Sequence, residues 1–221
     1  MGIIEILVKY KVEFLLGLGV TVKLCLIIWS AGLVLGTLLG VAAAKWRLAV
    51  GLPLKAVSFV LAGVPVLVFL FWMHYPLQSY LGIVVNPFYT AAATLSIVNI
   101  LLVSDLIKIH LLEFPDQYMA SARVCGLSYS KYVRHIQFPI IVRQVLPPLL
   151  VIQVTMLHST LFASLISVDE VFRIAQRINS QIYKPVEIYS GLAFLFLAVS
   201  LPLHGLSNWL KARFTRNLSE R

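Results

Sequence analysis

The chain has 221 residues, of which 60% are apolar and 12% are charged, and it carries a formal net charge of +9. Charged residues make up about a quarter of an average soluble domain, so this composition excludes an ordinary soluble fold of this length. It predicts an all-α integral membrane protein with a single transmembrane domain over residues 1–221.

Five apolar runs approach or exceed the length of about 20 residues that a helix needs to cross the hydrocarbon core of a membrane. They predict transmembrane helices at about 14–44, 56–75, 88–110, 143–168 and 187–211. The first run is too long, and begins too far from Met1, for a cleaved signal peptide. We therefore expect five crossings.

The distribution of Lys and Arg predicts the orientation, because these residues are retained on the cytoplasmic side of a membrane. With the N-terminus outside, the inward loops hold twelve of the eighteen Lys and Arg residues, the outward segments hold five, and Lys23 lies within the first span. We expect an N-out, C-in topology. The net charge then reflects this topology and contact with anionic lipid headgroups, and nucleic acid is not an expected partner.

Two ionisable residues lie near the inner end of the third span. Asp105 and Lys108 are three residues apart, so they can pair along one face of a helix. Ionisable groups within spans are candidates for function. The pair is interpreted either as a structural ion pair or lipid anchor, or as a contact of a cytoplasmic gate.

A polar stretch at 115–139, between the third and fourth spans, predicts two short helices joined at Gly126. Pro115 pre-sets the first turn of the first helix. Gly126 stands where a left-handed cap ends that helix, and Ser128 is placed to cap the second. Pro139 is expected to end or kink the second piece before the fourth span.

Each of these short helices has one apolar face. Tyr118, Ala122 and Cys125 share a face of the first, and Tyr129, Val133 and Ile136 share a face of the second. The opposite sides are polar and basic. Such a pair either lies on the lipid surface or docks onto another protein, and these two alternatives stay open at this point.

The fourth span carries several hydrogen-bonding side chains: Gln153, Thr155, His158, Ser159 and Thr160. Gln153 and Thr160 are seven residues apart and so lie on one face. Side chains of these types commonly hold membrane helices together. The alternative is that they line the path of a polar substrate.

The outward segment at 169–184 predicts an amphipathic helix, because Val171, Ile174 and Ile178 recur at helical spacing. Asp169 and Glu170 precede it. Their carboxylates either interact favourably with the positive N-terminal end of the helix dipole or contact a cationic substrate or basic residues of a partner.

Other chemistry is not indicated. Cys25 and Cys125 fall at different depths of the predicted topology, so no disulfide is expected. The five His residues are scattered, and no metal site or catalytic constellation is expected. The sequence has no GxxxxGK[ST] phosphate loop, so the chain is not expected to bind ATP in the usual manner.

The loop resembles the signature of type I ABC importer permeases. Gly126 is followed, after nine residues, by Ile136 and then by Phe138-Pro139, which is similar to the family's Gly and Ile-x-Leu-Pro. Ala120, Ser121 and Ala122 then stand at the family's Glu-Ala-Ala positions. Ala120 thus departs from the usual Glu, and this departure points mildly to a heterodimer whose partner carries the intact loop.

The resemblance covers nearly the whole chain. The stretches Ala62–Val68, Leu157–Thr160, Ser167–Asp169 and Ala175–Ile178 look like the polar amino-acid subfamily and its histidine-type branch. This implies a five-span permease of a bacterial inner membrane that imports an amino acid, with basic amino acids slightly favoured.

The resemblance also implies partners: an ABC ATPase dimer that holds ATP and Mg²⁺, a second permease subunit, and a periplasmic or extracellular amino-acid-binding protein. The chain itself is then a non-catalytic subunit without a cofactor of its own. The residues carried over as ATPase-coupling candidates are Gln117, Tyr118, Ala120, Ser121, Ala122, Arg123, Gly126, Ile136 and Pro139.

Two alternatives from other classes are considered. A secondary transporter or channel requires ion-coupling carboxylates in the middle of the membrane, and Asp105 is the one candidate. An anchor subunit of a redox enzyme requires haem or quinone ligands such as paired His residues, and His158 stands alone at that depth.

Overall fold

The structure is a computed structural model that describes residues 2–219, with side chains described as far as residue 214. The helices in chain order are α1 (Ile3–Lys9), α2 (Lys11–Ala31), α3 (Thr37–Lys45), α4 (Leu52–Ala62), α5 (Val66–His74), α6 (Pro76–Leu81), α7 (Pro87–Leu112), α8 (Asp116–Val124), α9 (Tyr129–Tyr132), α10 (Phe138–Ser159), α11 (Val171–Ile182) and α12 (Pro185–Ser219). Wider π-helical turns occur at Gly32–Gly36, Arg47–Gly51 and Val133–Gln137, and a 3₁₀ segment at Thr160–Ile166 follows α10.

The predicted all-α membrane architecture is confirmed. Within the described residues, four helical stretches are long and apolar enough to cross a membrane: Lys11–Lys45, Pro87–Leu112, Tyr129–Ile166 and Pro185–Phe214. A fifth span is possible if the bent pair Arg47–Ala62 and Val66–Leu81 crosses as one unit.

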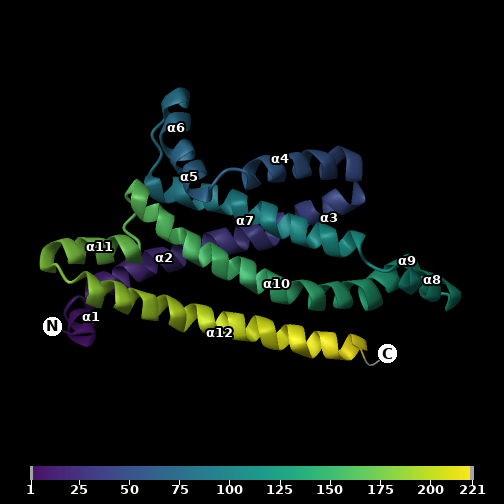
Figure 1. The fold of residues 1–221 in the computed structure, drawn as a ribbon. Coiled ribbons are helices and arrows are strands. Elements are labelled where there is room, and N and C mark those ends of the chain that lie inside the picture. The colour runs from purple at the N-terminus through teal and green to yellow at the C-terminus, as the bar shows by residue number, and fades with distance from the viewer. Residues whose placement is uncertain (1, 220–221) are drawn as a thin grey trace.

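The two ends of the helix bundle carry different elements (Figure 1). The N-terminus, α1 and α11 lie at one end, whereas α8, α9 and the end of α12 lie at the other. The loop at 115–139 and the N-terminus are thus at opposite ends, as the predicted topology requires. We refer to the end with α8 and α9 as the inner end, after that topology.

The second apolar run is not one straight helix. A single span was expected at 56–75, but α4 ends at Ala62, α5 begins at Val66, and the chain bends by 98° between them. Pro65 explains the break, since it has no N–H to donate and disfavours helical geometry at the residue before it.

The first span packs closely on α7 through glycines spaced one helical turn apart. A Cβ atom at Gly36 would lie 2.8 Å from the Val103 Cβ atom, and one at Gly40 would lie 2.7 Å from the Ser104 carbonyl oxygen. A Cβ atom at Gly32 would collide with the amide of Asn99. The glycines therefore let the two backbones approach, as small residues commonly do between membrane helices.

The outer end of the bundle has its own apolar cluster. Ile6 of α1, Phe14 of α2, Ile174 and Ile178 of α11, and Ile188 of α12 are all buried in it. This cluster confirms the predicted amphipathic helix at 171–182, whose apolar face packs on the bundle.

Gly36→Ala is expected to reduce the free energy of unfolding by roughly 1–3 kcal/mol, the usual cost of overpacking, because the backbone carbonyl of Ile100 also lies 2.9 Å from the new Cβ atom. Gly19→Ala is the matched control in α2, since nothing lies within 4 Å of a Cβ atom there. Thermal unfolding in detergent, followed by circular dichroism, measures both. Equal melting temperatures for Gly36→Ala and the wild type would contradict this packing.

Candidate functional site

The loop between α7 and α10 ends its first helix in a defined geometry. Gly126 has a φ of 70°, in the left-handed region. The Leu127 N–H donates to the Ala122 carbonyl oxygen at 2.9 Å, and the Gly126 N–H donates to that of Arg123 at 3.0 Å. These two bonds form a Schellman motif. The predicted left-handed cap at Gly126 is confirmed.

The loop is anchored on the inner ends of α7 and α10. Ala122 and Tyr132 are buried in an apolar cluster with Val103, Phe114 and Ile141. Tyr118, Val133 and Ile136 pack against the same cluster. The apolar sides of both short helices therefore face the bundle, which leaves their polar sides on the surface.

Several details of the loop differ from the expectation. Cys125 is exposed at the end of α8, and Tyr132 takes the buried place expected for Tyr129, which is exposed. Ser128 stands at the N-cap position of α9, but its side chain makes no capping bond. Pro139 does not end the second piece, because the chain stays helical from Tyr129 to Ile166.

The continuity at Pro139 has a local cause. Proline cannot donate to the carbonyl one turn earlier, which belongs to His135. The helix widens into a π-helical turn over Val133–Gln137, directly before α10 begins. The change in hydrogen-bond register thus absorbs the proline without a break.

The coupling candidates divide into an exposed and a buried group. Gln117, Ala120, Ser121, Arg123 and Gly126 are exposed, Tyr118, Ile136 and Pro139 are partly buried, and Ala122 is buried. The exposed Arg123 guanidinium lies 3.3 Å from the Met119 sulfur one turn earlier. The exposed group lies on the surface of α8 and of the turn that follows it, at the inner end.

One residue of this surface was missed by sequence reasoning. The Val124 side chain is 89% exposed at the end of α8, next to Gly126. It lies off the apolar stripe that packs on the bundle, and this offset is the signal that marks it. An apolar side chain on a polar tip is suited to contact with another protein.

A second feature is a cavity of about 390 Å³ between the α4–α5 bend, α7 and α10. Ser58 of α4, Asp105 of α7, and Thr155 and Ser159 of α10 contribute its polar lining. Among the described residues, the buried Ser58 hydroxyl has no hydrogen-bond partner. Ser58 thus places an unsatisfied hydroxyl at the wall of the cavity.

The ion pair expected in the third span is present. The Lys108 Nζ lies 3.8 Å from the Asp105 Oδ1, one turn along α7. The Asp105 side chain keeps about a third of its surface exposed and borders the cavity, whereas Lys108 is mostly buried. Asp105 therefore presents negative charge at the inner side of this cavity.

The five polar residues of the fourth span do not gather at one place. Only Thr155 and Ser159 line the cavity. The His158 Nε2 lies 2.8 Å from the Ser200 hydroxyl of α12, and Thr160 donates to the Leu157 carbonyl oxygen of its own helix. The His158 contact matches the alternative in which such side chains hold helices together, whereas the Thr160 bond stays within one helix.

Gln153 lies at a junction of three helices. Its Oε1 accepts a hydrogen bond of 3.1 Å from the Asn99 amide of α7, and its carbonyl oxygen accepts one of 3.1 Å from the Trp29 indole of α2. The same Asn99 amide donates to the Ile28 carbonyl oxygen at 2.8 Å. Gln153 is thus part of the packing between α2, α7 and α10.

Asp169 and Glu170, which precede α11, stabilise the first turns of that helix. The Glu170 carboxylate accepts bonds of 2.9 and 2.8 Å from the Phe172 and Arg173 N–H groups, which caps the helix. Asp169 pairs with Arg173 at 3.2 Å and with Arg177 at 3.9 Å. The cap at the helix N-terminus, one of the two alternatives, is present, but it was expected to be solvated and Glu170 is buried.

Glu170 is fully buried. Burial raises the pKa of this carboxyl to about 7, although hydrogen bonds from Phe172, Arg173 and Thr21 act in the opposite direction. Thr21 of α2 also accepts the Val171 N–H at 3.2 Å. The start of α11 is therefore tied to the first span by a buried polar contact.

No group of three or more His, Cys, Asp or Glu side chains within the described residues could hold a metal ion. The two cysteines, Cys25 and Cys125, are both free.

Comparison with known proteins identifies the family. Residues 32–216 match the model of the family described as "Binding-protein-dependent transport system inner membrane component", and the chain belongs to that family. It is 26% identical over 209 residues to the octopine transport system permease protein OccM of Rhizobium meliloti, which covers 90% of this chain and 85% of that one.

Two further relatives are transport permeases. The chain is 27% identical over 216 residues to the histidine/lysine/arginine/ornithine transport system permease protein HisM of Salmonella typhimurium, covering 92% and 91% of the two chains. It is 24% identical over 155 residues to the glutamine transport system permease protein GlnP of Escherichia coli, covering 70% and 71%. The predicted resemblance to permeases of polar amino-acid transport systems is confirmed by these matches.

Solved structures show the same fold. A chain in the crystal structure of an amino acid ABC transporter with histidines superposes with a TM-score of 0.83 at 23% identity, covering 94% of this chain and 96% of that one. A chain of the inward-facing MetNI methionine ABC transporter gives a TM-score of 0.70 at 15% identity, covering 92% and 97%.

Raising the pH is expected to destabilise the outer end of the protein. The folded state holds the Glu170 proton up to a pKa of about 7, whereas an ordinary Glu releases it near 4.5. The folded state then binds more protons than the unfolded chain between these values, so the free energy of unfolding falls as the pH rises through this window.

Glu170→Gln removes this titration and keeps an oxygen that can cap α11. The melting temperature of the variant is expected to fall less between about pH 5 and pH 7 than that of the wild type. Asp169→Asn, at an exposed neighbour, serves as the control. Parallel pH profiles for Glu170→Gln and the wild type would refute the role of Glu170.

Proposed function

We propose that this chain is the permease subunit of an ATP-driven importer of polar amino acids, in a bacterial inner membrane. Its family membership supports a place in a binding-protein-dependent transport system. The relatives named above are permeases of octopine, basic amino-acid and glutamine transport systems. The nucleotide chemistry then lies on a separate ATPase dimer, because this chain has no phosphate-loop sequence.

The observation that carries the coupling role is the construction of the loop at 115–139. Its apolar side is buried against α7 and α10, its polar side is exposed, and a Schellman cap fixes the end of α8. A surface that is rigidly joined to the bundle transmits a displacement instead of absorbing it. The loop is thus suited to receive motion from an ATPase.

The same helices connect the loop to the cavity. Ile107 of α7 and Ile141 of α10 pack in the cluster that holds α8, whereas Asp105 and Thr155 on these two helices line the cavity. A push on α8 is therefore carried along α7 and α10 to two walls of the cavity. Closure of the ATPase dimer would rock these helices between inward-open and outward-open states.

The cavity is proposed as part of the substrate path. The unpaired Ser58 hydroxyl and the Thr155 hydroxyl can hydrogen-bond to the polar ends of an amino acid, and the Asp105 carboxylate favours a positive charge. This supports a preference for basic amino acids. In this proposal Asp105 contacts the substrate while its ion pair with Lys108 holds it in place.

Two further partners follow from the proposal. A second permease subunit would complete the path, and Ala120 at the position of the family's usual Glu favours a different chain over a second copy. Ala120 is exposed on α8, so it would lie at the contact with the ATPase. A periplasmic or extracellular binding protein would deliver the amino acid at the end that carries α1 and α11.

Val124→Asp is expected to weaken binding of the ATPase about tenfold or more, because it places a charge where an exposed apolar side chain would be buried by the partner. Val84→Asp is the matched control, since Val84 is 99% exposed between α6 and α7. Co-purification of the ATPase with each variant measures the effect. Undiminished ATPase binding to Val124→Asp would count against this coupling surface.

Asp105→Asn is expected to reduce uptake of arginine about tenfold while changing uptake of glutamine little, because only the cationic side chain loses an opposite charge. Uptake into vesicles that hold the complete transporter measures both substrates. Asp169→Asn, at the outer end and outside the cavity, is the control. An equal loss for both amino acids would assign Asp105 to the gate or to structure.

A further inference from the structure

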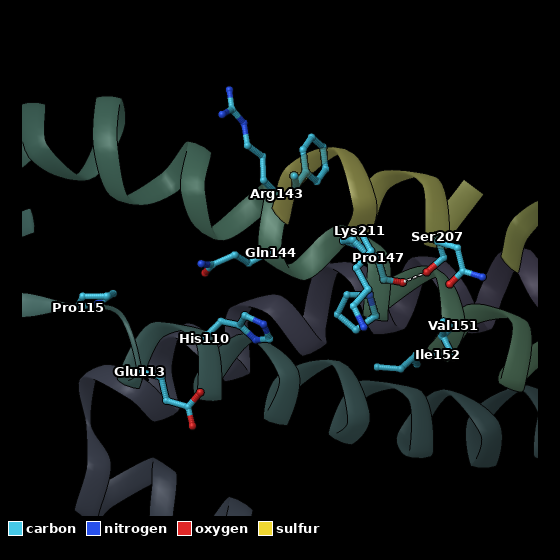
Figure 2. Close-up of a pocket in the computed structure, with 13 residues that line it drawn as sticks. His110, Glu113, Pro115, Arg143, Gln144, Pro147, Val151, Ile152, Ser207 and Lys211 are labelled. Carbon is cyan, nitrogen blue, oxygen red and sulfur yellow. Dashed lines mark hydrogen bonds between the residues drawn. The ribbon is translucent and has the colours of Figure 1, made fainter. Parts of the chain in front are cut away.

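A larger pocket, of about 850 Å³, lies at the inner end between α7, α10 and the last turns of α12 (Figure 2). It is separate from the proposed substrate cavity, and the two share no lining residue. Pro147 and Pro148 lie inside α10 along this pocket, and the Ser207 hydroxyl of α12 donates to the Pro147 carbonyl oxygen at 2.7 Å. This bond joins α10 and α12 at one wall of the pocket.

The polar part of the pocket is predominantly basic. Arg143 of α10 and Lys211 of α12 carry positive charge, His110 is the third basic side chain, and Glu113 is the acid. In Figure 2 the Arg143 and Glu113 side chains lie on opposite sides of the pocket and point away from each other. Among the described residues, Arg143 has no acidic partner. Its charge is therefore available to an anion.

The rest of the lining includes the polar residues Gln144, Ser207 and Asn208 and an apolar part on α10 and α12. Val151 and Ile152 extend the wall of α10 away from the inner end, and Phe214 contributes from α12. A ligand that fits this lining has an anionic head beside Arg143 and Lys211 and an apolar tail along α10. A small hydrophilic anion would leave the apolar walls unmatched.

The depth of the pocket agrees with such a ligand. The Arg213 guanidinium lies 5.1 Å from the centre of the Trp209 ring, and both residues flank Lys211 on α12. Trp and basic side chains collect at the boundary between lipid tails and headgroups. Lys211 and Arg143 are then at the level of the phosphates of one leaflet.

From this geometry we propose that the pocket binds an anionic phospholipid of the inner leaflet, with its phosphate between Arg143 and Lys211 and an acyl chain along Val151 and Ile152. Basic pockets between membrane helices on the cytoplasmic side recognise anionic headgroups through the same chemistry. Pro147 and Pro148 cannot donate to the carbonyl oxygens of Arg143 and Gln144. These acceptors suit the hydroxyl groups of a phosphatidylglycerol headgroup.

The test is native mass spectrometry of the delipidated transporter complex titrated with phosphatidylglycerol or phosphatidylcholine. Arg143→Gln and Lys211→Gln are each expected to weaken phosphatidylglycerol binding about fivefold, the effect of one basic residue near a membrane surface. Arg213→Gln is the matched control on the same helix, because Arg213 does not line the pocket. Arg143 is exposed, so its replacement is expected to leave the melting temperature unchanged.

Selective loss in the two pocket variants, with weaker binding of phosphatidylcholine and no displacement by inorganic phosphate, supports the proposal. Three outcomes would each overturn it. An equal loss with Arg213→Gln would indicate general attraction to a basic surface. Equal affinity for phosphatidylcholine would remove the role of the headgroup charge. Displacement of the lipid by inorganic phosphate would assign the site to a free anion.

Discussion

The close packing of the first span on α7 determines where the other helices lie. Lipid tails are as apolar as leucine, so helices in a membrane are held together by van der Waals contact and by polar bonds. Gly32, Gly36 and Gly40 supply the contact, because each lets α7 approach to a distance that a Cβ atom would block. Because Gly32 has no side chain, Asn99 of α7 fits beside it and donates hydrogen bonds to the backbone of α2 and to Gln153 of α10. Asn99 thus joins three helices.

Prolines border both pockets. Pro65 lies at the bend between α4 and α5 and borders the proposed substrate cavity, whereas Pro147 and Pro148 lie inside α10 and border the proposed lipid pocket. Within a membrane, backbone groups freed by such prolines need partners from protein or from a water-filled cavity. Pro147 and Pro148 leave the carbonyl oxygens of Arg143 and Gln144 without a helical donor, whereas Ser207 bonds to the carbonyl oxygen of Pro147 itself. The prolines thus border concave surfaces at the cost of backbone hydrogen bonds.

The sequence predicted those features that depend on local chemistry. Composition and apolar runs indicated the membrane helices, a lone Gly126 among polar residues indicated the left-handed cap, and an acid before an amphipathic run indicated the cap of α11. Each of these is decided within a few residues, by backbone geometry or by burial of one face. The break at Pro65 was not predicted, since the apolar run at 56–75 was expected to form a single span, and its 98° angle depends on packing.

The placement of polar residues in the fourth span could not be predicted in the same way. Helical spacing tells which residues share a face, but it does not tell which helix that face meets. Thr155 borders the cavity between α4, α7 and α10. His158 contacts Ser200 of α12, and Gln153 accepts a hydrogen bond from Asn99 of α7. Val124 was missed because the apolar stripe of α8 identifies the residues that are buried, and the exposed Val124 lies outside that stripe.

The helix that contains α10 links all of these sites. It runs without a break from Tyr129 to Ile166 over 38 residues, or roughly 57 Å at 1.5 Å per residue, which exceeds the hydrocarbon thickness of about 30 Å. In the proposed coupling, motion received at the loop passes Pro147 and Pro148 before it reaches Thr155 in the proposed substrate cavity. How much motion arrives therefore depends on how stiff the helix is at the two prolines. A phospholipid seated against them would contact the helix at that point, so the lipid and the ATPase would act on the same element.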